Sequence, residues 1–185
     1  RSIKKDYSGK LNLCFVGRMV DEKGVGLLLS AIMKNTDLSW VNMIYFIGDG
    51  PKKEVYQEEA YNIQNVKIEF LGSLSKSDLN RYYEKCQILI LPSISEGFPK
   101  VISEAAAYGC VPIVSNVGSI SQYLNEENGV LLNALTSESI SNALENLAYN
   151  RSLLKSMALN GMKTSGKFTY ENYIQKIQKL ILSYD

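Results

Sequence analysis

The chain has 185 residues, of which 45% are hydrophobic and 21% are charged, and its formal net charge is +1. This length and composition predict one globular domain over residues 1–185 with a sizeable core. Because the charges nearly balance, we expect no nucleic-acid partner. The sequence contains no histidine, which excludes a Ser-His-Asp triad or a Cys-His dyad within this chain.

Short apolar runs alternate along the chain with segments of helical periodicity. The runs with the length of buried strands are 11–17, 41–48, 66–72, 88–93, 111–115 and 129–132. The segments with helical periodicity are 25–32, 53–61, 75–86, 99–108, 136–147, 151–165 and 170–184. This alternation predicts an α/β fold, with a doubly wound, Rossmann-like parallel sheet covered by helices on both faces.

The cysteines and the chain start suggest where the protein resides. Cys14, Cys86 and Cys110 are odd in number, and we expect them to be reduced and buried, as in a cytosolic protein. The apolar runs are too short for a membrane-spanning helix. The first residue is Arg1 rather than Met. We therefore expect a cytoplasmic piece of a longer protein, with peripheral membrane association of that protein left open.

In a doubly wound sheet, ligands bind beyond the carboxyl ends of the strands, so the loops there are the candidate site. The first such loop, 17–24, holds Arg18 and Lys23 at the start of a helix. A guanidinium, an ammonium and free helix N–H groups suit a diphosphate. A solvated surface loop is the alternative on chemistry alone. The loop matches neither a Walker P-loop nor a dinucleotide fingerprint.

We expect the loops after the second and third predicted strands to shape the fold more than to bind a ligand. Gly48 and Gly50 allow a sharp turn, and one acid, Asp49, does not make a metal site. Leu74 could offer an apolar surface to a nucleobase or fasten the next helix to the core, and the sequence alone favours the second role. We therefore expect no metal ion.

Two acids flank a Gly-Phe-Pro corner in 95–109, with seven residues between Glu96 and Glu104. Pro99 suits the first turn of a helix, whose free N–H groups favour an anion. Glu96 beside an anion site makes sense if it accepts hydrogen bonds from neutral hydroxyls. Glu104, further along the helix, can accept two hydrogen bonds from the vicinal diol of a ribose. Hydroxyls, a diphosphate and a diol together describe a sugar nucleotide.

The ordered set of these motifs resembles glycosyltransferase family 4, also called group 1. The residues that carry the resemblance are Gly17-Arg18, Lys23-Gly24, Gly48-Asp49-Gly50-Pro51, Phe70-Leu71-Gly72, Pro92-Ser93, Glu96-Gly97-Phe98-Pro99, Glu104-Ala105, Gly109, Val111-Pro112 and Asn128-Gly129. More narrowly, the chain resembles the C-terminal, donor-binding half of a GT-B enzyme. One departure is the segment 117–122, where many relatives carry Gly-Gly-x-Pro-Glu and this chain reads VGSISQ.

The resemblance implies a role for each site residue. The catalytic residues would be Arg18 and Lys23, which hold the donor's diphosphate, and Glu96, which accepts hydrogen bonds from the transferred sugar. Further donor contacts would come from Gly17, Leu74, Gly97, Phe98, Pro99, Lys100 and Glu104, with Glu104 on the ribose and Leu74 near the base. Lys100 could equally be solvated.

The resemblance also implies a reaction and its partners. It implies transfer with retention of configuration from a UDP- or GDP-type sugar, without a metal ion or other cofactor. A glycan or lipid-linked acceptor would bind to an N-terminal domain missing from this chain, in polysaccharide or glycoconjugate synthesis. A non-catalytic sugar-nucleotide-binding module and a nucleotide-sugar epimerase on a similar fold are the alternatives.

Overall fold

The computed structural model describes residues 5–97 and 100–165. Its strands are β1 (Leu11–Val16), β2 (Val41–Ile47), β3 (Ile68–Gly72), β4 (Ile88–Leu91), β5 (Val111–Ser115) and β6 (Val130–Leu132). Its α-helices are α1 (Val25–Lys34), α2 (Lys53–Tyr61), α3 (Lys76–Lys85), α4 (Lys100–Ala107), α5 (Ser137–Tyr149) and α6 (Arg151–Ser165), and its 3-10 turns are η1 (Asp21–Lys23) and η2 (Ile120–Gln122). The helix expected over 170–184 lies outside the described residues.

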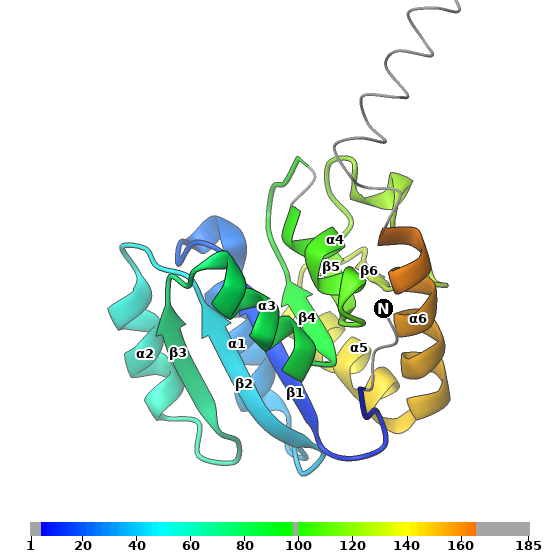
Figure 1. The fold of residues 1–185 in the computed structure, drawn as a ribbon. Helices are drawn as coiled ribbons and strands as arrows, with labels where there is room; N and C mark the ends of the chain where they lie inside the picture. Colours follow the sequence, from blue (N-terminus) through cyan, green and yellow to red (C-terminus); the bar gives the residue numbers. More distant parts are fainter. Residues whose placement is uncertain (1–4, 98–99, 166–185) are drawn as a thin grey trace, which may run out of the picture.

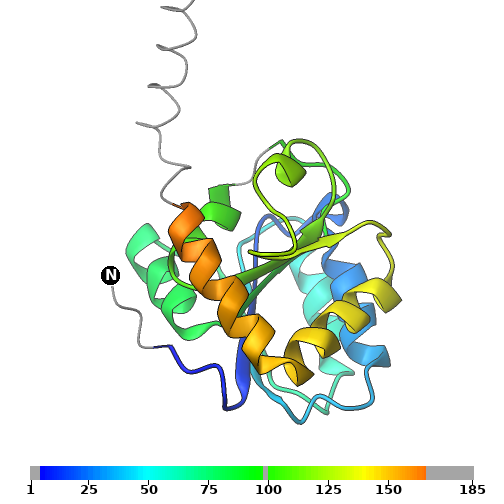
Figure 2. The ribbon, with the colours of Figure 1, turned by 90° about the vertical axis from the view of Figure 1, so that its right-hand side faces the viewer.

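The strands form one sheet in the order β3-β2-β1-β4-β5-β6, and each neighbouring pair is parallel. Figure 1 shows this sheet with helices in front of and behind it. In the turned view of Figure 2, α3, α4 and α6 lie on one face, whereas α1, α2 and α5 lie on the other. The predicted doubly wound fold is confirmed, and the strand order reverses between β1 and β4, where such folds bind ligands.

The core follows from strands that are apolar on both faces. Leu13, Phe15, Ile44, Ile88 and Ile113 are all completely buried. A row of aromatic rings crosses three strands on one face, since Phe46 lies 5.8 Å from Phe15 and 4.7 Å from Phe70 between ring centroids. Such contacts stabilise the packing of β1, β2 and β3 against one another.

Two helices begin at the caps that the sequence predicts, and the cysteines are buried as expected. The Ser75 side chain accepts a hydrogen bond from the Asp78 N–H, and Thr136 forms a reciprocal capping box with Ser139. Each cap satisfies backbone donors that the helix leaves unpaired. The three cysteines are free and buried, as expected.

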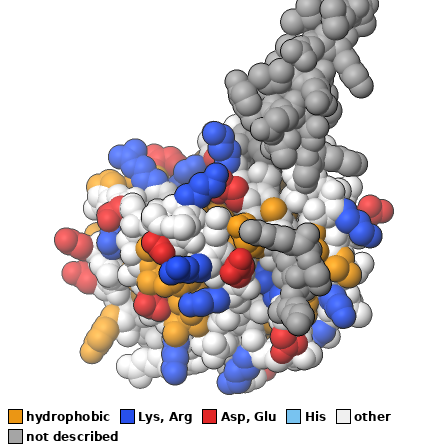
Figure 3. Space-filling view, viewed as in Figure 1, with side chains coloured by type: hydrophobic (Ala, Val, Ile, Leu, Met, Phe, Trp, Pro, Cys, Tyr) orange, Lys and Arg blue, Asp and Glu red, His pale blue; other side chains and the backbone are white. Residues whose placement is uncertain are grey.

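The surface carries charges of both signs. On the face seen in Figure 3, Lys and Arg side chains are interspersed with Asp and Glu side chains. This mixture agrees with the net charge of +1. Within the described part of the chain, no helix is both long and apolar enough to span a membrane.

Candidate functional site

The loops after β1 and β4 meet where the strand order reverses. Gly24 ends η1 with a φ of 71°, and a Cβ at this position would lie 2.0 Å from the Pro92 carbonyl oxygen. The Ile94 N–H donates to the Glu22 carbonyl oxygen at 2.8 Å. Glycine at position 24 therefore permits a backbone approach that brings the first cationic loop against the loop that holds Glu96.

Lys23 and Glu96 form an ion pair at this junction. The Lys23 Nζ lies 2.5 Å from Glu96 Oε1, and the Ser93 hydroxyl donates to the same oxygen at 2.8 Å. The exposed fraction of the side chain is 27% for Lys23 and 9% for Glu96. Among the described residues, both donors bind Oε1 and neither binds Oε2. The pair holds a nearly buried carboxylate in one orientation, with its second oxygen left to accept further hydrogen bonds.

Sequence reasoning identified Lys23 and Glu96 separately but did not foresee their direct contact. It listed Ser93 among the residues that carry the resemblance but gave no role to this side chain, which is completely buried. A polar residue directly after an apolar strand and three residues before an acid is the signal that could have found it. The contact itself joins residues 73 positions apart, so no local pattern predicts it.

The loop after β5 supports the backbone of Glu96. Gly118 has a φ of 60°, and a Cβ there would lie 2.0 Å from the Glu96 carbonyl oxygen. Ser119 donates to the Gly97 carbonyl oxygen through its backbone N–H at 3.4 Å and its hydroxyl at 3.2 Å. The segment that departs from many relatives therefore packs against the Glu96–Gly97 peptide, and the lone Gly118 is what permits this packing.

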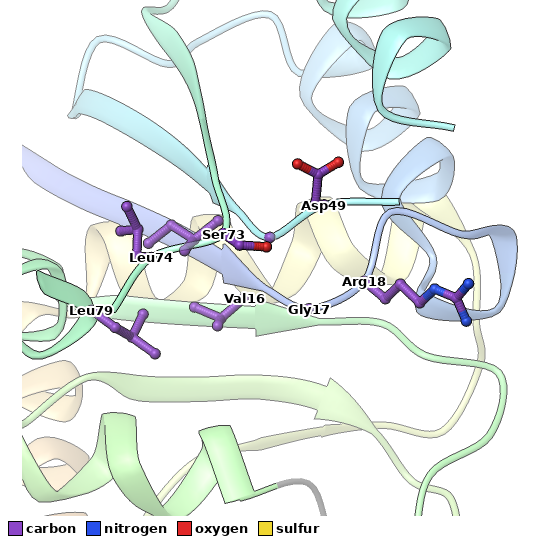
Figure 4. Close-up of a pocket in the computed structure, with 9 residues that line it drawn as sticks. Val16, Gly17, Arg18, Asp49, Ser73, Leu74 and Leu79 are labelled. Atoms are coloured by element: carbon purple, nitrogen blue, oxygen red, sulfur yellow. The ribbon is translucent and has the colours of Figure 1, made fainter. Parts of the chain in front are cut away.

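An open cavity of about 470 Å³ lies beyond the carboxyl ends of β1, β2 and β3. Its lining is formed by Val16, Gly17, Arg18, Ile47, Gly48, Asp49, Ser73, Leu74 and Leu79. In Figure 4, Leu74, Leu79 and Val16 lie toward one end, and the Arg18 side chain lies at the other. The cavity thus has an apolar end suited to a flat ring. At the other end lies Arg18, which belongs to the same loop as Lys23, and Asp49 also lines the cavity.

Leu74 packs against the core, the role that the sequence favoured, and its contact with a nucleobase stays a prediction. It is partly buried and packs against the core, and it also lines the cavity. Packing of one face against the core fixes the side chain while its other face stays available to a ligand.

Asp49 is a structural residue of the turn after β2, as predicted. Its Oδ1 accepts from the Gly50 N–H at 2.8 Å, and its Oδ2 accepts from Lys53 at 3.3 Å. These contacts, the Gly50 amide first, lower the pKa of Asp49 below its ordinary value. A Cβ on Gly50 would lie 2.6 Å from the Met19 carbonyl oxygen, so this turn packs directly against the Arg18 loop.

The remaining predicted residues fall between positions 97 and 104 of the chain. Lys100, at the start of α4, is exposed, and Glu104, about one turn further, is partly buried. Gly97 is exposed, with no atom within 4 Å of a Cβ placed there. Phe98 and Pro99 lie outside the described residues. The ligand contacts of all five residues remain predictions.

The sequence model of the family described as "Glycosyl transferases group 1" matches residues 1–164. The chain belongs to this family. An uncharacterised glycosyltransferase of Methanocaldococcus jannaschii is 31% identical to this group 1 chain over 170 residues, which cover 90% of the chain and 46% of the relative. The chain spans about half the length of the curated relatives that it matches.

Solved structures share the fold of this group 1 chain. Anabaena HepE in complex with UDP and glucose superimposes with a TM-score of 0.81 at 19% identity, over 96% of this chain and 49% of that chain. The C-terminal domain of a group 1 glycosyl transferase, LpcC from Francisella tularensis, superimposes with a TM-score of 0.75 at 23% identity, over 86% of each chain. At these identities the likeness establishes the shared Rossmann-like fold.

Proposed function

We propose that this chain is the donor-binding half of a retaining glycosyltransferase that uses a nucleotide-diphosphate sugar. The observation that carries the proposal is the Lys23–Glu96 pair, 2.5 Å apart. Its two loops follow β1 and β4, at the same edge of the parallel sheet as the cavity that Arg18 and Leu74 line. In this proposal the nucleobase lies at the apolar end of the cavity, the diphosphate lies at Arg18 and Lys23, and the sugar lies at Glu96.

The charges fit the bond that breaks. Cleavage of the anomeric C–O bond builds negative charge on the departing diphosphate and positive charge on the sugar. Arg18, Lys23 and the N–H groups at the start of α4 would stabilise that negative charge where it develops. Loss of one such donor should cost ~3 kcal/mol of transition-state stabilisation, about a hundredfold in rate.

Glu96 has the character of a positioning group for the donor sugar. One of its oxygens already accepts from Lys23 and Ser93, and the other can accept from sugar hydroxyls. We propose that it is neither a nucleophile nor a general base. A glycosyl adduct on Glu96 in the longer enzyme would contradict this role.

The other donor contacts complete the proposal. Glu104 would bind the ribose diol, and its loss should cost ~1–3 kcal/mol, mostly in donor binding. Gly17 and Leu74 would meet the nucleotide, since both line the cavity. Gly97, Phe98, Pro99 and Lys100 would contribute backbone or charge near the sugar and phosphates.

The longer protein's biology is part of the same proposal. We propose transfer without a metal ion or other cofactor, from a UDP- or GDP-type donor to a glycan or lipid-linked acceptor. Acceptor binding would lie in a domain outside this chain, in cytoplasmic synthesis of a polysaccharide or glycoconjugate. Structures of the same fold in complex with UDP support a nucleotide donor.

Calorimetry with the 185-residue chain tests donor binding. UDP, GDP, ADP and their sugar conjugates are titrated into the unaltered chain and into the Arg18→Ala and Glu104→Ala variants. Lys155→Ala, an exposed cation on α6, is the control for loss of one charge. We expect binding of at least one nucleotide, weakened in both site variants and unchanged in the control. Lack of binding by every nucleotide would refute the proposal.

Activity of the longer protein separates an enzyme from a binding module. We expect sugar transfer or donor hydrolysis by the protein that carries this chain. Tight nucleotide binding without any turnover would instead favour a non-catalytic module.

A further inference from the structure

A tyrosine and a lysine from α2 and its preceding turn bind an acid in the loop that carries Lys23. The Tyr56 hydroxyl donates to Asp21 Oδ1 at 2.9 Å, and Lys52 donates to Asp21 Oδ2. Tyr56 is only 3% exposed, so its ring is fixed in the core while its hydroxyl reaches the surface. We call Asp21, Lys52 and Tyr56 the Asp21 cluster.

The Asp21 cluster fastens the outer side of the turn that presents Lys23. Asp21 is the first residue of η1, and its carbonyl oxygen accepts from the Gly24 N–H at 2.9 Å. The inner side of the same turn is held by the bond from Ile94 to the Glu22 carbonyl oxygen. The turn is therefore tied to α2 on one side and to the Glu96 loop on the other.

Within the cluster, the tyrosine contact matters more than the lysine contact. The side chains of Lys52 and Asp21 are 46% and 61% exposed, and exposed ion pairs contribute little. The Tyr56 bond joins a rigid, buried ring to an ionised acceptor, which is a stronger arrangement with little side-chain entropy to lose. The hydrogen bonds from Lys52 and Tyr56 lower the pKa of Asp21.

Charge alone gives no reason for an acid at this position. A carboxylate two residues from Lys23 would repel a diphosphate, and Lys52 offsets that charge. An anchoring role does explain the acid, because an ionised oxygen is the strongest acceptor available for the Tyr56 hydroxyl.

We propose that Tyr56, through its hydrogen bond to Asp21, positions the η1 turn so that Lys23 meets the donor's diphosphate. Tyr56 is a positioning residue, and the inference rests on the proposed function. It implies that α2 tunes affinity for the diphosphate part of the donor without contacting it, and leaves affinity for the nucleoside part unchanged.

Two pairs of variants of the 185-residue chain isolate the hydrogen bond. Tyr56→Phe removes the donor and keeps the ring. Asp21→Ala and Asp21→Asn remove the same charge, but only the asparagine keeps an acceptor for Tyr56. Tyr149→Phe is the control, because it breaks a similar tyrosine bond, 3.0 Å to Asp37 Oδ2, on an exposed residue of α5.

Affinities for UDP, GDP and ADP are measured by calorimetry, and those for uridine, guanosine and adenosine by NMR titration. For the nucleotide that binds, we expect Tyr56→Phe to weaken affinity by about three- to tenfold, with nucleoside affinity unchanged. We expect Asp21→Ala to bind the nucleotide more weakly than Asp21→Asn by a similar factor, and Tyr149→Phe to bind as the unaltered chain does.

The outcomes distinguish this inference from the proposed function. If the unaltered chain binds none of the nucleotides, both are overturned. If it binds a nucleotide and Tyr56→Phe binds equally well, only the positioning role is overturned. Equal weakening for nucleotide and nucleoside would indicate a general loss of structure and would also overturn it.

Discussion

Replacement of Gly24 by alanine should separate the two loops that form the candidate site. The left-handed φ of 71° at this position costs an L-residue roughly 1–2 kcal/mol. The added Cβ would also lie 2.0 Å from the Pro92 carbonyl oxygen, and this backbone atom must move. We expect the two effects together to lower the free energy of unfolding by about 2–4 kcal/mol.

Urea unfolding followed by the fluorescence of Trp40, the single tryptophan, measures this change. Trp40 is 7% exposed, so its emission should report loss of the core. Gly26→Ala is the matched control, because Gly26 lies within α1 and its nearest neighbour to an added Cβ is the Tyr56 Cε1 at 3.6 Å. This ordinary contact and the helix propensity of alanine should raise stability by about 0.5–1 kcal/mol.

The sign of the difference tests the reasoning. We also expect Gly24→Ala to weaken nucleotide binding, because Lys23 and Glu96 sit on the two loops that must part. Equal stability of Gly24→Ala and the unaltered chain, with unchanged nucleotide affinity, would show that the loops do not approach as closely as the structure indicates.

Three further changes have expected outcomes. Lys5→Met removes an ammonium that donates to the Tyr83 and Cys86 carbonyl oxygens at the end of α3, at 2.7 and 2.5 Å. We expect this change to lower the free energy of unfolding, measured by thermal unfolding, by about 1–2 kcal/mol. A backbone amide and Lys53 lower the pKa of Asp49, so its stabilisation is present above the unfolded pKa of 3.8 and is lost as pH falls through the folded pKa; Asp49→Asn should flatten acid unfolding there. EDTA should leave sugar transfer by the longer protein unchanged, and loss of transfer restored by a divalent ion would contradict the metal-free proposal.

Much of the fold could be predicted from local sequence because its signals are local. Strands with both faces buried read as continuous apolar runs, and helices read as periodic stripes behind caps such as Ser75 and Thr136. The start and end of α2 agree with the expected range 53–61. The sequence alone also placed Arg18, Lys23 and Glu96 in loops at one edge of a parallel sheet.

Only the tertiary structure decided which of these residues meet. Lys23 contacts Glu96 because β1 and β4 are neighbours in the sheet, and strand order is not written in any local pattern. The same holds for Gly118 beneath Glu96 and for Tyr56 on Asp21. The periodicity of the sequence indicates whether a side chain is buried, but the residue that it contacts depends on how distant segments of the chain pack. The sequence could therefore identify the candidate site residues, whereas only the fold determined which of them form the site.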